Sequence, residues 1–359
     1  MRHRDHTAAA RQPAPATLGG ERRQLLRQLL ALGSAAILAP PASSATTPTV
    51  AVVADAALAR YAFPAPHPFD GERQNALLHD TAAAALLARA VRCGSRPATR
   101  AELLRFHTAA HIARVSSAEA RGLAALDDGD TPVYPGIFTA ACHVVGAALA
   151  TLSAVMGGEY RRSLQPIGGL HHGARDHASG FCVFNDLGVV IATLRRDYHI
   201  ERIAYVDIDA HHGDGVFYGF EDDAGVIIAD IHQDGRTLFP GTGGADETGR
   251  GGAAGTKLNI ALPPRAGDRE FLAAWPAVEA HLARFAPQFF ILQCGADGLA
   301  GDPLAQLEYS SAVHAYVSAR VCALAARHAQ GRVMAFGGGG YDHANLSQAW
   351  TAVLAALLA

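Results

Sequence analysis

Lysine is almost absent from this chain, because Lys257 is the only one and arginine supplies the other basic side chains. Charged residues make up only 18% of the 359 residues, and the formal net charge is −3 at pH 7. A chain without an excess of positive charge does not attract polyanions, so the composition does not favour nucleic-acid binding. We interpret the preference for arginine as base-composition bias in the encoding genome.

Cysteine is also scarce and scattered. The five thiols are odd in number and form no C-x-x-C pair: Cys93, Cys142, Cys182, Cys294 and Cys322. This arrangement argues against a disulfide framework and against a structural zinc finger. We therefore expect free thiols, most of them buried.

Residues 1–48 differ in composition from the rest of the chain. Arg22 and Arg23 precede a short apolar stretch, LLALGSAAILA, which is followed by small residues, PASSA. This order is typical of a secretory leader of the twin-arginine kind, and it predicts a periplasmic protein. The apolar stretch is too short to span a bilayer comfortably, so no membrane span is expected. The alternative is a start codon further downstream, or a disordered extension, on a cytoplasmic protein.

Residues 49–359 contain no linker, low-complexity tract or internal repeat, which predicts one large domain. Apolar runs alternate there with helical, alanine- and leucine-rich stretches; the runs are TVAVVA, RIAYVDID, GVIIADI, KLNIAL, QFFILQCGAD and RVMAFGGGG. The runs are continuously apolar, as in parallel strands that are covered on both faces. The pattern predicts an α/β fold with a single open, mainly parallel sheet flanked by helices on both faces.

Polar residues follow several of these runs at the same end. The segments are DIDAHHGDG, DIHQDG, CGADGLAGD and GGGGYDH. The carboxyl ends of parallel strands meet at one edge of the sheet, which is where open α/β folds bind their ligands. We therefore expect these segments to form one site.

The residue types at this edge indicate a metal ion. Asp207 and Asp209 are two apart on a strand end and share a face, Asp209 and His211 can reach one ion, and Asp297 adds a carboxylate from another strand. Burying these aspartates would be costly unless a cation offset their charge. Two carboxylates and one imidazole with open positions fit a catalytic Zn²⁺ or Fe²⁺ site.

Tandem histidines and a tyrosine supply further chemistry. His171 and His172 stand between glycines, and the remaining aspartates, Asp207 and Asp214, could orient them as acid–base groups. Tyr341 follows four glycines, where its phenol could donate a hydrogen bond to a developing oxyanion. Taken alone, Tyr341 would equally suit an ordinary tyrosine at the edge of a core.

Five motifs in this order resemble the zinc-dependent histone deacetylase superfamily: GGLHHGARDHASGFCVFND, YVDIDAHHGDGV, FPGTG, QCGADGLAGDPL and GGGGYDHANL. Two more segments, HPFDGER and DTPVYPGIF, look most like the bacterial acetoin-utilisation type deacetylases. The resemblance runs from about Val50 to the C-terminus and implies the arginase–deacetylase type of α/β fold.

Residue by residue, the resemblance implies a complete hydrolytic site. It places the zinc ligands at Asp209, His211 and Asp297, with Fe²⁺ or Co²⁺ as alternative ions. The catalytic residues that it implies are His171, His172, Tyr341, Asp207 and Asp214. The substrate-binding residues that it implies are Phe181, Phe239, Asp130, Gly180 and Leu304.

Some positions carry finer implications. Phe181 and Phe239 match the aromatic walls of the substrate tunnel, Asp130 matches the rim aspartate, and Arg73 matches the arginine of an inner product-exit channel. Leu304 stands where some acetylpolyamine-specific relatives carry a glutamate, so a polyamine gains no counter-charge there.

The resemblance also implies a structural K⁺ ion next to the zinc. Asp207 and the backbone carbonyls of Asp209 and His211 match that site. Asp230 stands where relatives often carry serine, and Ile231 follows it. An added carboxylate could strengthen the monovalent site or be used elsewhere.

The function implied is a metal-dependent amidohydrolase that removes acetyl or related acyl groups from lysine-like amines. In this hypothesis His172 is the general base, Tyr341 stabilises the oxyanion and His171 tunes the charge. The alternatives are a deacetylase for acetylpolyamines or other small acyl-amines, a two-metal ureohydrolase on the same fold, and a non-catalytic acyl-amine binder. The natural substrate and the oligomeric state are left open by the sequence.

Overall fold

Parallel strands form the centre of the computed structural model, which describes residues 50–359. Eight strands make one sheet in the order β2-β1-β3-β8-β7-β4-β5-β6, and every neighbouring pair is parallel. The strands are β1 (Val50–Val53), β2 (Val91–Cys93), β3 (Arg162–Gln165), β4 (Ile203–Asp207), β5 (Val226–Gln233), β6 (Lys257–Leu262), β7 (Phe289–Gln293) and β8 (Val333–Phe336). The predicted fold class is therefore confirmed.

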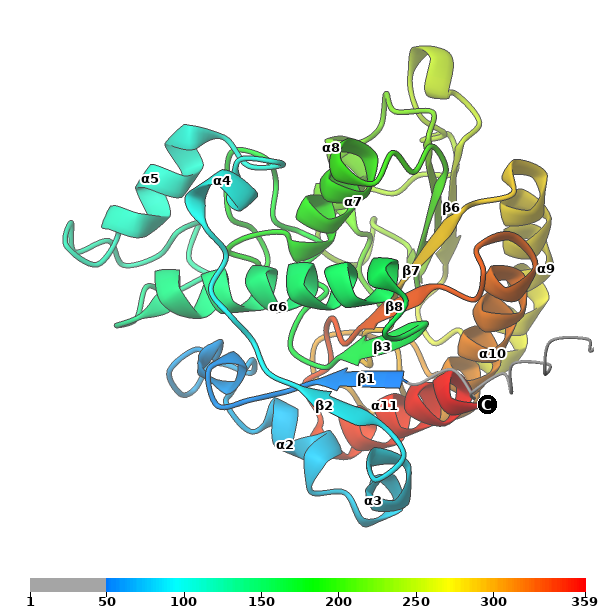
Figure 1. The fold of residues 1–359 in the computed structure, drawn as a ribbon, viewed down its shortest axis with the longest axis horizontal. Helices are drawn as coiled ribbons and strands as arrows, with labels where there is room; N and C mark the ends of the chain where they lie inside the picture. Colours follow the sequence, from blue (N-terminus) through cyan, green and yellow to red (C-terminus); the bar gives the residue numbers. More distant parts are fainter. Residues whose placement is uncertain (1–49) are drawn as a thin grey trace, which may run out of the picture. The chain divides into compact units, whose positions relative to one another are not determined.

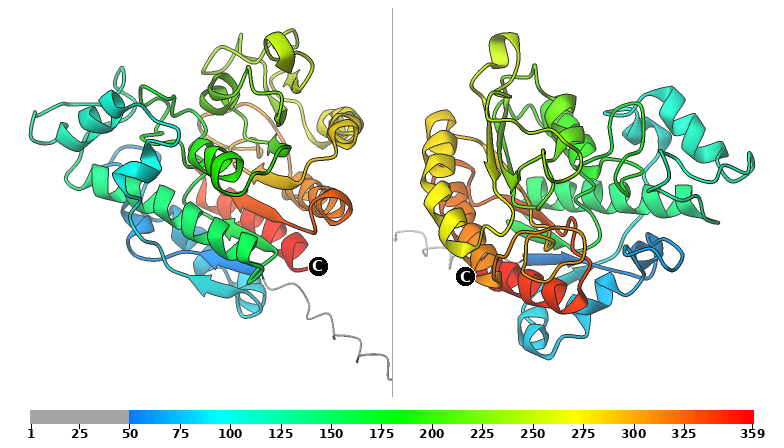
Figure 2. Two further views of the ribbon diagram at one scale, coloured as in Figure 1. Left: turned by 45° about the horizontal axis from the view of Figure 1, so that its top comes forward. Right: turned by 180° about the vertical axis from the view of Figure 1, so that it is seen from behind.

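Helices cover both faces of this sheet (Figure 1). They are α2 (Arg73–Leu78), α3 (Thr81–Leu87), α4 (Arg100–Leu103), α5 (Ala109–Ser117), α6 (Ile137–Gly157), α7 (Asp186–Asp197), α8 (Asp214–Gly219), α9 (Asp268–Phe285), α10 (Ser311–His328) and α11 (His343–Leu358). Two short 3₁₀ turns, Leu58–Arg60 and Gly251–Ala253, complete the described elements. Figure 2 shows α9, α10 and α11, coloured yellow to red, lying together along one side of the sheet.

The alternation of side chains along the strands separates the core into two layers. In β4, Ile203 and Tyr205 pack with α6 and α7, whereas Ala204 and Val206 pack with α9 and α10. Successive strand residues point to opposite faces, so a strand that is covered on both faces must be apolar throughout. This explains why the strand runs are continuously hydrophobic.

Helix α6 is long and apolar enough to cross a membrane by length and composition alone, and no other helix in residues 50–359 meets that test. However, 67% of its most apolar window is buried inside the protein, where it packs against the sheet. We therefore interpret α6 as a core helix. The predicted leader, residues 1–48, lies outside the described residues.

Candidate metal centre and substrate cavity

The carboxyl ends of the central strands bring the predicted site together. Strand β4 ends at Asp207, which lies opposite Asp230 of β5 on one side and Gln293 of β7 on the other. The loops that follow β4 and β7 carry the predicted metal ligands. This is the convergence that the parallel arrangement predicts.

Asp209, His211 and Asp297 lie together, as the spacing predicted. Each of the three offers a ligand atom, and these atoms all lie within 4.8 Å of one another. The Nδ1 atom of His211 lies 3.1 Å from Asp209 Oδ1 and 3.0 Å from Asp297 Oδ2. All three residues are buried, so their charges have little contact with water.

The electrostatics of this triad favour a bound cation. Burial, together with the charge of Asp209, raises the pKa of Asp297 to about 7. Burial alone would lower the pKa of His211, but hydrogen bonds and charges from Asp209 and Asp297 outweigh it and raise that pKa to about 10. Two buried carboxylates thus draw positive charge to the point between them, which is the place that a divalent ion would take.

Glycine leaves the room that such an ion needs. A Cβ atom on Gly339 would overlap Asp297 Oδ2 and would lie 2.9 Å from Asp209 Oδ2, and one on Gly295 would overlap Asp209 Oδ2. The donor set and the backbone around it therefore both fit a catalytic divalent cation with open coordination positions.

Gln293 is a contributor that the sequence reasoning missed. Its Nε2 atom donates to Asp209 Oδ2 at 2.8 Å, and the backbone N–H of Gly339 donates to the same oxygen at 2.8 Å. The other carboxylate is also held, because the N–H of Ala210 donates to Asp297 Oδ1 at 2.8 Å. These donors fix the orientation of the two carboxylates that are predicted to bind the metal. Its position at the end of β7, in register with Asp207, is the signal that could have identified Gln293.

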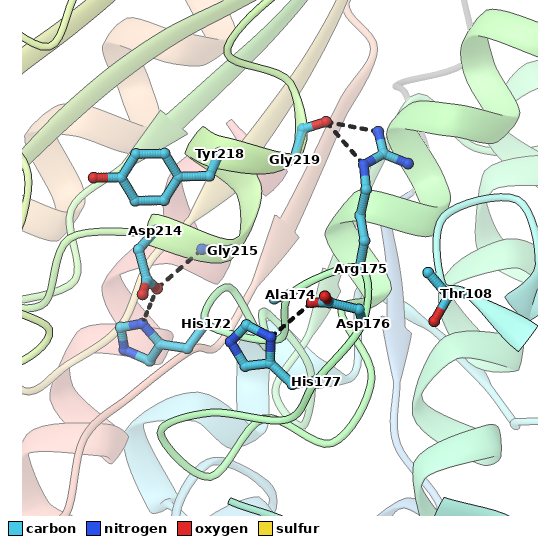
Figure 3. A pocket seen from close by; sticks show the side chains of 10 residues that line it. All are labelled: Thr108, His172, Ala174, Arg175, Asp176, His177, Asp214, Gly215, Tyr218 and Gly219. Atoms are coloured by element: carbon cyan, nitrogen blue, oxygen red, sulfur yellow. Dashed lines mark hydrogen bonds and ion pairs between the residues drawn. The ribbon is translucent and has the colours of Figure 1, made fainter. Parts of the chain in front are cut away.

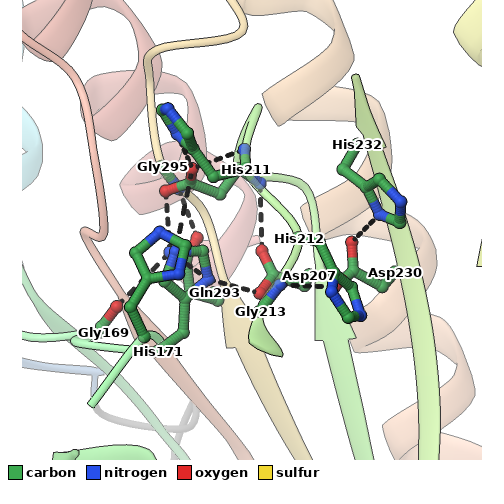
Figure 4. Close-up of polar contacts among 12 residues, drawn as sticks. Gly169, His171, Asp207, His211, His212, Gly213, Asp230, His232, Gln293 and Gly295 are labelled. Atoms are coloured by element: carbon green, nitrogen blue, oxygen red, sulfur yellow. Dashed lines mark hydrogen bonds and ion pairs between the residues drawn. The ribbon is translucent and has the colours of Figure 1, made fainter. Parts of the chain in front are cut away.

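The tandem histidines form the two predicted imidazole–carboxylate pairs, His171 with Asp207 (Figure 4) and His172 with Asp214 (Figure 3). His171 Nδ1 lies 2.8 Å from Asp207 Oδ2, and His172 Nδ1 lies 2.7 Å from Asp214 Oδ1. The two rings are adjacent, with centroids 4.1 Å apart. Burial, assisted by His171, lowers the pKa of His172 to about 4, so this imidazole is neutral near pH 7 and can accept a proton.

The two carboxylates differ in their exposure. The side chain of Asp207 is fully buried, whereas that of Asp214 keeps 19% of its surface exposed. His172 and Asp214 line a pocket of about 470 Å³, together with Thr108, Arg175 and Tyr218 among others (Figure 3). Of the two pairs, that of His172 and Asp214 is thus the one that this pocket exposes to solvent.

Tyr341 lines a narrow cavity of about 20 Å³ together with Asp209 and His211. The cavity is lined by predicted site residues from separate loops, namely His171, His172, Gly180, Phe181, Asp209, His211 and Tyr341, together with Phe69, Cys182 and parts of the glycine run. Burial, with repulsion from Asp297 and Asp209, raises the pKa of Tyr341 well above its usual value. The phenol therefore keeps its proton and can donate a hydrogen bond.

Phe181 lines the narrow cavity and Phe239 lies next to His172, while their role as the walls of a substrate tunnel stays a prediction. The ring of Phe181 packs edge-on against Tyr341 with centroids 5.8 Å apart, and the Phe239 ring lies 5.0 Å from His172. A Cβ atom on Gly180 would come within 2.7 Å of the His172 ring and 2.8 Å of the Phe239 ring, so only glycine fits there. Phe181 itself has a φ of 68°, a left-handed conformation that costs a bulky residue energy and is concentrated at functional sites.

The other two predicted substrate-binding residues, Asp130 and Leu304, are exposed and do not line the narrow cavity. Asp130 contacts the wall through its backbone, because its carbonyl oxygen lies 3.1 Å from Nε2 of His67, which packs on Phe181. Leu304 keeps 38% of its surface exposed. The rim role of Asp130 and the effect of Leu304 on substrate choice stay predictions.

Arg73, predicted to border a product-exit channel, is fully buried. Its guanidinium donates to the carbonyl oxygens of Gly340 at 3.0 Å and Gly338 at 2.6 Å, and it lies 3.8 Å from the centroid of the Phe69 ring. In this structure Arg73 therefore holds the glycine run that precedes Tyr341.

At the predicted site of the monovalent cation, the structure shows how the Asp230 carboxylate is bound. Both oxygens of Asp230 have partners: His232 Nδ1 lies 2.7 Å from Oδ1, and the N–H of Gly213 donates to Oδ2 at 2.9 Å. Burial opposes protonation of His232, but Asp230 outweighs it and raises the His232 pKa. The added carboxylate is thus used in a buried pair with histidine. Ile231 is buried next to it, and the K⁺ ion stays a prediction.

Comparison with known proteins agrees with this geometry. Residues 67–357 match the family model described as the histone deacetylase domain. Acetoin utilization protein AcuC of Bacillus subtilis is 39% identical over 255 residues, which are 69% of this chain and 66% of that protein. A histone deacetylase-like amidohydrolase of Pseudomonas aeruginosa is 35% identical over 259 residues, or 69% and 65% of the two chains. The match thus spans slightly less than two thirds of these relatives' own length.

A solved structure shares the fold. The crystal structure of the HDA15 HD domain superposes with a TM-score of 0.78 and 27% sequence identity. The superposition covers 87% of this chain and 89% of that one. The similarity therefore extends over nearly the whole of the described sheet and its helices.

Proposed function

This chain belongs to the histone deacetylase domain family, and from that premise we propose that it is a metal-dependent amidohydrolase that removes acetyl or related acyl groups from lysine-like amines. The observation that carries the proposal is the meeting of three elements around one narrow cavity. These are a carboxylate–imidazole metal triad, a neutral His172 held by a carboxylate, and a protonated Tyr341.

The metal triad and Tyr341 would together polarise the amide. A divalent ion bound by Asp209, His211 and Asp297 supplies Lewis-acid activation of the amide carbonyl and of the attacking water. Because two carboxylate ligands cancel the charge of such an ion, further help is needed at the carbonyl oxygen. The Tyr341 hydroxyl provides it by donating a hydrogen bond to the negative charge that develops there.

His172 would transfer the proton. Its Nδ1–H is held by Asp214, which leaves Nε2 free to accept a proton from the attacking water. The water oxygen adds to the carbonyl carbon, the C–N bond breaks, and the proton passes from Nε2 to the leaving nitrogen. The products are a carboxylate and a free amine. His171, held by Asp207, adjusts the charge next to His172.

The shape of the cavity supports a slim substrate. Phe181 and Phe239 would flank an extended aliphatic stem, and the space beyond them is small. We therefore propose a lysine-like chain that carries an acetyl group as the substrate. Zn²⁺ is the proposed ion, with Fe²⁺ and Co²⁺ as alternatives that share this ligand set.

A panel assay tests the proposal directly. Full-length protein loaded with zinc, iron or cobalt would be assayed for carboxylate release from acetyl-lysine peptides, acetylpolyamines and longer acyl-lysines. We expect release from acetyl-lysine peptides, loss of activity with a chelator, and recovery when the ion returns. Tight binding of these ligands without release would instead support a non-catalytic binder.

Counting metal ions separates the proposal from a two-metal ureohydrolase. Within residues 50–359, Asp209, His211 and Asp297 are the only group of three ligand residues close enough to share an ion. We expect one transition ion per chain in metal analysis. Two manganese ions per chain would favour the ureohydrolase.

The localisation remains part of the proposal. An exported enzyme would lose its twin-arginine leader, and N-terminal sequencing of protein extracted from cells would detect the cut. A mature chain that begins before Arg22 would contradict export by this route.

A further inference from the structure

Asp302 is a buried aspartate for which neither the sequence motifs nor the proposed chemistry assigns a role. It retains only 7% of its accessible surface. Its two oxygens accept from two different segments of the chain: Oδ1 from the N–H of Leu304 at 2.9 Å, and Oδ2 from the N–H of Tyr341 at 2.9 Å. One carboxylate thus joins the exposed loop after β7 to the backbone of the proposed oxyanion donor.

The backbone before Tyr341 needs such support because it is built from glycine. Gly338 and Gly340 have φ values of 62° and 116°, which glycine adopts readily and other residues rarely do. A Cβ atom at Gly338 or Gly339 would overlap the side chain of Gln293 or Asp297, so the run cannot be stiffened by larger residues. Its conformation must therefore be fixed by hydrogen bonds from outside.

Those hydrogen bonds come from several elements. Arg73 binds the carbonyl oxygens of Gly338 and Gly340, and the N–H of Ala296 donates to the carbonyl of Gly339 at 3.0 Å. The N–H of Gly339 donates to Asp209. The N–H of Tyr341 is the last one before the N-cap of α11, and Asp302 is its acceptor. Loss of this bond would release the end of the run that carries the phenol.

We propose that Asp302 is a positioning residue that holds the Tyr341 backbone so that the hydroxyl faces the metal triad, and that it couples this position to the Leu304 loop. This inference rests on the proposed deacetylase function. The same carboxylate holds both segments, so a change at Asp302 would affect the Leu304 loop as well as Tyr341. Displacing a catalytic group by about 1 Å can cost up to about a hundredfold in rate, so a positioning bond has a measurable effect on kcat.

Asp302→Asn is the informative substitution. The amide keeps the size of the carboxylate but has one acceptor oxygen, and its NH₂ group would face the second backbone N–H. We expect kcat for an acetyl-lysine peptide to fall about tenfold with KM within about twofold, because binding walls are unchanged and the oxyanion donor is displaced. Asp302→Ser, whose shorter side chain leaves its oxygen farther from the Tyr341 N–H, should also lower kcat and serves if the Asn variant is poorly folded.

A double-mutant cycle shows whether Asp302 acts through Tyr341. In the Tyr341→Phe background we expect Asp302→Asn to change kcat by less than about twofold, because the group it positions is absent. An equal loss in both backgrounds, or an unchanged kcat in the single variant, would overturn the inference.

Amide hydrogen exchange gives a readout that does not depend on activity. Exchange at the Tyr341 amide should rise at least about tenfold in Asp302→Asn. The matched control is Asp80→Asn, since Asp80 accepts from Ala83 N and Ser347 Oγ and should affect neither kcat nor Tyr341 exchange. If the unaltered protein released no acyl group from any substrate, the proposed function would fail, and unchanged exchange at Tyr341 would separately refute the role of Asp302.

Discussion

At the scale of single residues, Tyr341 is the most direct test of the proposed chemistry. Its phenol is protonated and lines the same cavity as Asp209 and His211. Replacing it by Phe removes one donor to the oxyanion and should lower kcat by about 10² to 10³, with little change in KM. Steady-state kinetics with a fluorogenic acetyl-lysine peptide measure this. Tyr316→Phe, on an exposed site of α10, is the control, and near-normal rates for Tyr341→Phe would remove its assigned role.

Gly339 is a second informative residue, because the site leaves no space for a side chain there. A Cβ atom there would overlap Asp297 Oδ2, which is one of the proposed ligand groups. Gly339→Ala should therefore lower the affinity for the divalent ion by at least about tenfold, measured as metal content after dialysis against a graded chelator. Gly252→Ala, where a Cβ atom would meet nothing within 4 Å, should retain its metal. Equal metal content in the two variants would argue against a site between Asp209 and Asp297.

At the scale of elements, the sequence predicted the strands and the site segments that have a clear local pattern. It missed short strands and contacts between segments that are distant in the sequence. The segments after β4, β5, β7 and β8 carried enough acidic, histidine and tyrosine residues to predict one site. Strands β2 and β3 were not predicted, because VRC and RSLQ are short and partly polar. Gln293 and Asp302 were missed for a related reason: each acts on a partner that is distant in the sequence. No spacing within one segment reveals such contacts.

Lys257, the only lysine in the chain, makes hydrogen bonds that hold the start of strand β6. The ammonium of Lys257 donates to the carbonyl oxygens of Asp223 and Val226, at 2.9 and 2.5 Å, and to Thr256 Oγ1 at 3.0 Å. It thus ties β6 to the loop that precedes β5. Lys257→Met keeps the apolar stem but removes the ammonium's hydrogen bonds, including the one to the buried carbonyl of Val226, which should lower the free energy of unfolding by about 1 to 3 kcal/mol. Urea unfolding monitored by circular dichroism measures this loss.

A surface ion pair in the same region is the control for this prediction. Arg250 pairs with Glu221 at 2.9 Å, and the Arg250 side chain is 75% exposed. Because exposed pairs contribute little, Arg250→Met should cost less than about 1 kcal/mol. Equal losses for the two variants would show that the Lys257 contacts contribute no more than a surface pair.

At the scale of the whole molecule, the division of the core into two layers follows from the sheet alone. Every inner strand is covered on both faces, so the apolar runs determined the fold class before any contact was known. The positions of the polar side chains inside that core could not be predicted from composition. His107, which the sequence predicted as a packing or hydrogen-bonding group, is buried and bonded to Asn185, a partner that only the structure identifies.

His107 makes the stability of the whole domain sensitive to acid. It is buried, and its Nε2 accepts from the N–H of Asn185 at 2.9 Å. Burial, with a contribution from His111, lowers its pKa to about 3. In the unfolded chain a histidine titrates near pH 6.5, so between pH 6.5 and about 3 the unfolded state binds one more proton than the folded state. Stability should therefore be complete above pH 6.5 and fall as the pH drops, by up to about 1.4 kcal/mol per pH unit from this residue.

His107→Gln isolates this contribution, because a glutamine oxygen can still accept from Asn185 but does not titrate. The free energy of unfolding, measured by urea titration from pH 7 to pH 4.5, should fall less steeply with acid in His107→Gln than in the unaltered protein. His79→Gln, at an exposed position after α2, should leave the slope unchanged. Parallel slopes for the unaltered protein and His107→Gln would mean that His107 takes up its proton without unfolding, and that carboxylates elsewhere set the acid limit of the domain.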